Sequence, residues 1–161
     1  MKTGKTDISI NEIINHIRHR EYMSGVERDR SRIIATGEVY TPTSEVQKFI
    51  DEIPDSVWQD PQSTFADTEG CGDGQFLGEI IIKRVQHGIG FETALRTCFG
   101  IEKEADNAEV CRNRLLCNQE HLRHIVNTNI VTADADLYHG RFDGTDPNKT
   151  DRDLILDKFI E

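Results

Sequence analysis

The strongest constraint on the fold is a glycine-rich turn that joins a short apolar strand to an apolar helix. The strand is predicted over residues 64–67, and the turn follows over 69–74 with glycine at every second position. A helix is predicted over residues 76–87, where apolar residues recur at helical spacing. Glycine lets a ligand approach the backbone closely, and the helix N-terminus behind the turn offers N–H groups. The turn alone does not decide the function, because a plain strand-to-helix connection uses the same residues.

Three further strands are predicted along the chain, over residues 98–101, 129–132 and 154–156. A helix over residues 103–119 separates the first two of them. Strands that alternate with helices are typical of an α/β domain with a parallel sheet. The sequence therefore predicts an α/β fold in which the carboxyl ends of the strands meet at one edge of the sheet.

The first 36 residues are predicted to form a helical extension in front of the α/β domain, which spans residues 37–161. Ser9 and Glu12 have the spacing of a capping box at the start of a helix over residues 7–20. We therefore expect this extension to begin with a well-defined helix.

Isoleucines recur at helical spacing over residues 10–17 and give this first helix an apolar face. A more polar helix or a loose arm is predicted over residues 24–35. Another helix is predicted over residues 43–53, beginning at a threonine or serine that can cap it.

Composition excludes several classes of protein. The 161 residues carry a formal net charge of −10, which excludes a strongly basic nucleic-acid binder. No apolar run approaches the roughly 18 residues of a membrane span, and the basic N-terminus has no signal-peptide core after it. The four cysteines include no C-x-x-C pair, and since no secretory signal is predicted, we expect them to be reduced thiols in a cytoplasmic protein. The cysteines and histidines of residues 111–124 have the wrong spacing for a zinc knuckle, so no metal site is predicted.

Acidic residues end two of the predicted strands. Glu102 ends the second strand and is placed to bind a ribose diol. Asp134 ends the third strand and is placed to accept a hydrogen bond from the exocyclic amine of adenine. Together with the glycine turn, these strand ends predict a pocket for an adenosine-type cofactor at the carboxyl edge of the sheet.

Residues 67–77, Asp-Thr-Glu-Gly-Cys-Gly-Asp-Gly-Gln-Phe-Leu, resemble the D-P-A-C-G-S-G-x-F-L signature of N6-adenine DNA methyltransferases. Residues 37–42, Gly-Glu-Val-Tyr-Thr-Pro, resemble the G-x-x-[FY]-T-P segment that precedes it in gamma-type enzymes and type I modification subunits. Residues 100–102 and 133–135 resemble the next two motifs, and the resemblance covers about residues 36–160. It implies the class I methyltransferase Rossmann-like fold with strand order 3-2-1-4, S-adenosylmethionine as the cofactor, and a role in restriction-modification.

The resemblance also implies roles for individual residues. The methionine end of the cofactor would lie against Tyr40, Thr41 and Pro42. The residues that would pass beneath the cofactor or lie near it are Asp67, Gly70, Cys71, Gly72, Gly74 and Phe76. Glu102 would take the ribose hydroxyls. The adenine ring would lie between Ile101 and Lys103, with its amine bound by Asp134 in the segment that includes Ala135.

The sequence departs from the family pattern at two places. Thr68-Glu69 stands where the family usually has Pro-Ala, which adds the Glu69 carboxylate near the pocket. The catalytic motif [DNS]-P-P-[YFW] should follow the fourth strand, but residues 157–160 read Asp-Lys-Phe-Ile without either proline. In the family this motif holds the flipped adenine and accepts its amine hydrogens. Asp157 is therefore the one catalytic candidate, and residues 146–149, which include an Asp-Pro pair, are predicted to be a turn.

Three hypotheses about function follow. The chain is an S-adenosylmethionine-dependent N6-adenine methyltransferase that reaches DNA through a partner subunit, or a cofactor-binding subunit without transfer activity. The third hypothesis is an acidic interaction protein that imitates DNA on a basic partner. The fourth strand would be an exposed sheet edge, so a second copy or another subunit is predicted to cover it with the isoleucine face of residues 10–17.

Overall fold

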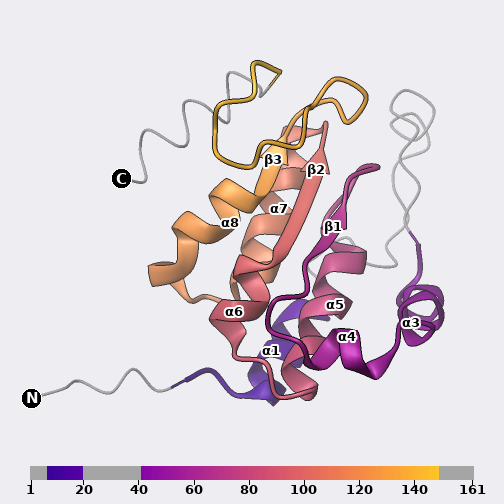
Figure 1. Cartoon of the computed structure of the whole chain (residues 1–161). Helices are drawn as coiled ribbons and strands as arrows, with labels where there is room; N and C mark the ends of the chain where they lie inside the picture. The colour runs from indigo at the N-terminus through magenta and orange to yellow at the C-terminus, as the bar shows by residue number, and fades with distance from the viewer. Residues whose placement is uncertain (1–6, 20–40, 149–161) are drawn as a thin grey trace, which may run out of the picture.

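The computed structural model describes residues 7–19 and 41–148 (Figure 1). Within these ranges the protein is a mixed α/β structure with a small parallel sheet, as predicted. Four predictions lie outside the described residues, namely those for the segment 24–35, Tyr40, the strand over 154–156 and Asp157.

The sheet has three parallel strands, β1 (Phe65–Asp67), β2 (Cys98–Glu102) and β3 (Ile130–Thr132). β2 lies in the centre, with Asp67 beside Gly100 and Glu102 beside Thr132. Each strand begins and ends within one residue of the prediction. The predicted four-strand order 3-2-1-4 is not seen, because the described residues hold three strands in the order β1-β2-β3.

Helices α5 (Gln75–Gln86) and α7 (Ala105–Leu116) pack together against one face of the sheet. A Cβ at Gly100 of β2 would lie 2.8 Å from Leu77 of α5, so glycine is what allows this helix to approach the central strand. The larger apolar core joins Cys98 of β2 to residues of both helices. The shorter helices α6 (Phe91–Arg96) and α8 (Arg123–Asn129) pack on each other beside this layer (Figure 1).

A second, smaller apolar cluster is formed by residues of β2 and β3 that alternate along each strand with the residues of the larger core. It joins Ile101, Val131 and Ala133 to Tyr138 of the loop that follows β3. Phe142 of the same loop packs its ring against Tyr138, with the ring centroids 5.5 Å apart. This loop therefore covers part of the sheet near the carboxyl ends of the strands.

Helix α1 (Ile10–Ile17) begins at the predicted capping box. The Ser9 backbone N–H donates to the Glu12 carboxylate at 2.8 Å, and the Glu12 N–H donates to the Ser9 hydroxyl at 3.2 Å. The helix ends at Ile17 rather than at residue 20, because Arg18 has already left helical geometry and forms the C-cap. The capping motif therefore marks the start of α1, which lies three residues after the first residue of the predicted helix, and it does not mark the end.

The isoleucine face of α1 is used inside the protein. Ile13 and Ile17 are buried, and a methyl group of Ile17 lies 2.7 Å from the place that a Cβ of Gly78 on α5 would occupy. The Arg18 guanidinium forms a two-pronged pair with the buried Glu79 carboxylate, at 2.9 and 2.8 Å. The prediction that this face covers a partner's strand is wrong, because α5 and α7 already cover it. Coverage of the fourth strand by another chain stays a prediction.

Helix α3 (Thr43–Asp51) starts where the sequence predicts and ends two residues early. The five-residue helix α4 (Asp55–Gln59) follows it, and the 3-10 helix η1 (Glu120–Leu122) precedes α8. Trp58 of α4 is buried and stacks on Phe65 of β1 with ring centroids 4.9 Å apart. In the described parts of the chain no helix is long and apolar enough to cross a bilayer.

Candidate functional site

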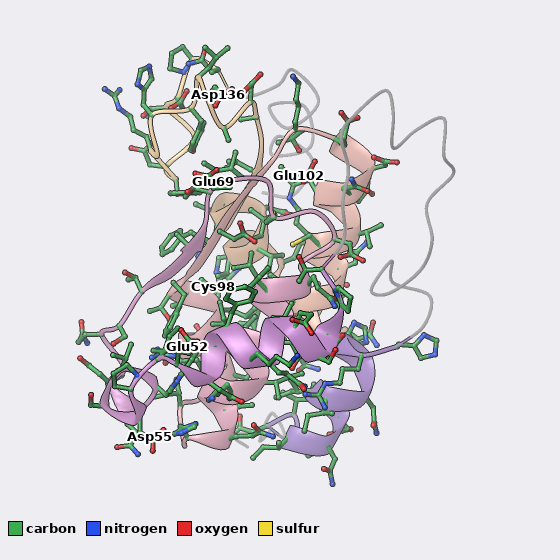
Figure 2. The ribbon with its side chains drawn as sticks, turned by 90° about the vertical axis from the view of Figure 1, so that its right-hand side faces the viewer. Glu52, Asp55, Glu69, Cys98, Glu102 and Asp136 are labelled. Atoms are coloured by element: carbon green, nitrogen blue, oxygen red, sulfur yellow. The ribbon has the colours of Figure 1, made fainter. Side chains whose placement is uncertain are left out.

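A cavity of about 870 Å³ opens at the carboxyl ends of the three strands. The strands point to this end of the molecule in Figure 1, and Figure 2 shows Glu69, Glu102 and Asp136 gathered there. Asp67 of β1, Glu102 of β2 and Asp134, which follows β3, all line the cavity. Its volume is within the range of roughly 300–1,000 Å³ that small-molecule sites occupy. Ligands of open α/β sheets bind at this edge, so the cavity is the candidate site.

The turn between β1 and α5 requires glycine at three alternate positions. Gly70, Gly72 and Gly74 have φ angles of 109°, 55° and 88°, a region that residues with side chains rarely adopt. A Cβ at Gly74 would also lie 2.9 Å from the sulfur of Cys111 on α7. The Cys71 N–H donates to a carbonyl of β2 at 2.8 Å and fixes the turn to the central strand. The backbone is thereby held close to the cavity floor.

Glu102 connects the glycine turn to the start of α7. Its side chain is 7% exposed, and one carboxylate oxygen accepts from the Gly72 N–H at 2.7 Å. The other oxygen accepts from the Glu104 N–H at 2.8 Å. Glu102 is thus held rigidly in the cavity wall, at the position predicted for a ribose ligand.

A buried arginine supports the glycine turn from the side of the helices. Arg114 of α7 is 0% exposed, and its guanidinium donates to the Asp73 carboxylate at 3.3 Å and to the Gln75 side-chain oxygen at 3.1 Å. The same guanidinium donates to the Ile17 carbonyl of α1 at 2.7 Å. Gln75 donates in turn to the Thr43 hydroxyl at the start of α3, at 2.8 Å. Three helices are therefore bonded to one turn.

The carboxylates at the ends of β1 and β3 have opposite electrostatic surroundings. Burial raises the pKa of Asp67; a backbone hydrogen bond from Glu69 opposes this shift, and the negative charge of Glu69 adds to it. The pKa of Asp134 is lowered, first by a hydrogen bond from the Asp136 N–H and then by the ammonium group of Lys103 at 3.2 Å. Lys103, predicted to flank an adenine ring, is placed beside Asp134 at the cavity wall.

The loop that follows β3 forms another wall of the cavity, which Tyr138 and His139 line. The Tyr138 hydroxyl donates to the Arg141 carbonyl at 2.7 Å. The Asp146 carboxylate accepts from the His139 N–H at 2.6 Å and from the Asn148 N–H at 2.9 Å. The bond from Asn148 closes an Asx turn, so the turn predicted for this segment is confirmed.

Most of the predicted site residues come together at this cavity. Those that line it are Thr41, Asp67, Glu69, Gly70, Cys71, Gly72, Phe76, Ile101, Glu102, Lys103, Asp134 and Ala135. Pro42 and Gly74 are described but do not line the cavity. Pro42 is the N-cap of α3 and Gly74 is the N-cap of α5, and each lies next to a residue that lines the cavity or close to one.

Sequence reasoning missed a second carboxylate at two of the strand ends. Each strand end carries two acids that are two residues apart, and all of them line the cavity: Asp67 and Glu69, Glu102 and Glu104, Asp134 and Asp136. This repeated spacing is visible in the sequence and would have found Glu104 and Asp136. No comparable signal marks Asn107, Tyr138 or His139, which also line the cavity.

The cysteines in the glycine turn and beside it add no charge to the cavity. A hydrogen bond with Cys111 and burial both raise the pKa of the Cys71 thiol, and burial raises that of Cys98. These thiols are therefore protonated at neutral pH. All four cysteines are free thiols, and no three His, Cys, Asp or Glu side chains in the described parts could together hold a metal ion.

The fold and the cavity define a class of protein in broad terms, a small α/β protein with a ligand-sized cavity at its strand ends. No family model matches the chain, and no curated protein or solved structure matches it either. The resemblance to N6-adenine DNA methyltransferases therefore stays a prediction from the motifs.

Proposed function

We propose that this protein binds S-adenosylmethionine in the cavity at its strand ends. The observation that supports this most strongly is that Asp67, Glu102 and Asp134, from three neighbouring strand ends, line one cavity beside a glycine turn. The ribose hydroxyls and the amine of an adenine nucleoside are donors that carboxylates can accept. The finer proposal is a class I methyltransferase fold, in which residues 154–156 add a fourth strand next to β1.

The residues present fit this cofactor in size and chemistry. Glu102 would accept the ribose hydroxyls, and Asp134 would accept the adenine amine. Ile101, Ala133 and Tyr138 supply apolar surface of the kind that an adenine ring needs. When bound, the cofactor supplies a methyl group on a sulfonium centre. The chain's own part would be to hold the nucleoside rigidly at the sheet edge.

We further propose, from the motif resemblance, that the methyl group goes to the exocyclic amine of adenine in DNA. Asp157 would accept an amine hydrogen. The net charge of −10 opposes direct binding of a phosphate backbone, so a partner subunit would supply the DNA contacts.

A second candidate function is cofactor binding without methyl transfer. Residues 157–160 lack both prolines that fix the amine-accepting carbonyl in the family motif, and this favours a binding subunit over a complete enzyme.

Calorimetry on the full chain tests cofactor binding. S-adenosylmethionine should bind at one site, and Glu102→Gln should weaken that binding about ten- to a hundredfold, because a charged acceptor is lost. Glu120→Gln, at an exposed pair with Arg123, is the matched control and should leave affinity unchanged. Urea unfolding of each variant separates loss of the site from loss of the fold. Binding of neither the cofactor nor S-adenosylhomocysteine would refute the proposal and favour the acidic interaction protein.

Transfer of a tritiated methyl group to adenine-rich DNA tests the second step. Label should appear on adenine with the wild-type chain, and Asp157→Ala should abolish it without changing cofactor affinity. Cofactor binding without incorporation, with and without candidate partner subunits, would instead support the non-catalytic binder.

A further inference from the structure

We infer that the cavity selects the cationic sulfonium form of the cofactor over its neutral thioether product, S-adenosylhomocysteine. This inference rests on the proposed function, and it adds that the charge of the cavity decides which form of the cofactor binds more tightly. It is drawn from the charges around the cavity.

The cavity wall is strongly acidic. Two carboxylates at each of three strand ends give six acids, against Lys103 as the one lysine or arginine among the described residues that line the cavity. With histidine neutral, the formal charge of the lining residues is therefore −5. Figure 2 shows that these acids come from separate segments, with Glu69 after β1, Glu102 in β2 and Asp136 in the loop after β3.

Two cations that the structure describes near the cavity, Lys103 and Arg114, already form ion pairs with Asp134 and Asp73. The Lys103 ammonium group lies 3.2 Å from Asp134. Arg114 lies on the far side of the glycine turn, where it donates to Asp73 and to the Ile17 carbonyl. The protonated thiols of Cys71 and Cys98 contribute no charge. Among the described residues, the lining of the cavity therefore carries a net negative charge, and a ligand in the cavity meets this charge.

Glu69 is the residue that gives this chain its particular charge. It stands where the resembling family usually has alanine, directly after β1, and it is exposed at the cavity mouth. Burial also leaves the neighbouring Asp67 with a raised pKa, to which the charge of Glu69 contributes. An added carboxylate at this position favours a positively charged ligand and does nothing for a neutral one.

The two forms of the cofactor differ by one methyl group and one positive charge. A unit positive charge a few ångströms from a carboxylate is attracted to it even in a water-like dielectric, and several carboxylates act together here. We therefore expect S-adenosylmethionine to bind at least about tenfold more tightly than S-adenosylhomocysteine. The preference should shrink at high salt, because the outer carboxylates are exposed and screened.

Calorimetry with three ligands tests the inference on the full chain. The ligands are S-adenosylmethionine, S-adenosylhomocysteine and an analogue in which a protonated amine on carbon replaces the sulfonium. Both cationic ligands should bind more tightly than the thioether at low salt, and the difference should fall at about 1 M salt, where the screening length is roughly 3 Å. Glu69→Gln and Asp136→Asn should each reduce the preference about two- to threefold without weakening the thioether, since each removes one exposed charge.

Glu120→Gln is the matched control, because it removes a charge outside the cavity lining and should leave the preference intact. Equal affinity for all three ligands would overturn the inference and leave the proposed function standing. Binding of none of them would overturn both.

Discussion

In the helix layer behind the glycine turn, buried arginines donate hydrogen bonds to defined acceptors. In the cavity on the other side of the turn, the described lining residues include six carboxylates and one lysine. Arg114 and Arg112 of α7 are both buried, and both donate to backbone carbonyls as well as to side chains. The cavity acids lie at strand ends, where Glu69 and Asp136 are exposed to solvent. We conclude that the helix layer holds the fold together and that the cavity carries a charge suited to recognition.

Breaking the buried arginine network should have the largest effect. Arg114→Met removes the donors of Asp73, Gln75 and the Ile17 carbonyl, and leaves a buried carboxylate without that cation. We expect a loss of about 3–5 kcal/mol in the free energy of unfolding, measured by urea denaturation. The control Arg96→Met breaks an exposed pair with Glu92 and should cost less than about 0.5 kcal/mol. Similar losses for the two variants would show that the buried network carries no special share of stability.

Filling the gap between α1 and α5 should have an intermediate effect. Gly78→Ala puts a Cβ 2.7 Å from a methyl group of Ile17, so α1 must shift. We expect a loss of about 1–3 kcal/mol in urea denaturation. Gly90→Ala is the matched control, since no atom lies within 4 Å of its added Cβ, and it should change stability by less than about 0.5 kcal/mol. An unchanged Gly78→Ala protein would mean that α1 is not tightly packed.

Removing charge from the cavity should hardly change stability. Glu69→Gln takes one of six neighbouring carboxylates from an exposed position, so we expect a change of less than about 0.5 kcal/mol, and in the stabilising direction. A clear loss in urea denaturation would mean that Glu69 has a structural role and would weaken the contrast between the two regions.

The smallest effect concerns the ion pair at the cavity wall. Asp134 has a lowered pKa in the folded protein, so it favours folding above about pH 4, and this contribution disappears as the pH falls through its folded pKa. Carbon-detected NMR should show Asp134 titrating below an ordinary aspartate. Lys103→Gln should raise this pKa only in part, because the hydrogen bond from Asp136 is the larger cause. Lys48→Gln, which breaks an exposed pair with Glu45, should leave it unchanged.

The sequence predicts the strands, the glycine turn and the capping box well, because each depends on local chemistry. The three strands match within a residue, since apolar runs between turn residues have few other arrangements available. The role of the α1 isoleucines was predicted wrongly. An apolar helix face in a sequence indicates only that the face is covered. The three-dimensional packing shows that α5, at Gly78, and α7 of the same chain cover it.

The candidate site was predictable where it lies on strand ends and unpredictable where it lies on the loop after β3. Glu102 and Asp134 follow from the position of acids after strands. Tyr138 enters the site because its ring packs under Ile101 and Val131, and this depends on a loop path that no local pattern encodes. Arg114 also escaped prediction, because an arginine in a helix pattern normally indicates a solvent-exposed face.

The bond from Arg114 to the Ile17 carbonyl has a consequence for any shortened form of this chain. The next methionine after Met1 is Met23, so a polypeptide begun there would lack α1 altogether. It would keep every described residue that lines the cavity. Arg114, which supports the glycine turn, would lose its hydrogen bond to the Ile17 carbonyl, and Glu79 would lose its ion pair with Arg18. Removal of α1 would thus leave the sequence of the described cavity lining unchanged while taking away a hydrogen bond that holds the arginine behind the glycine turn in place.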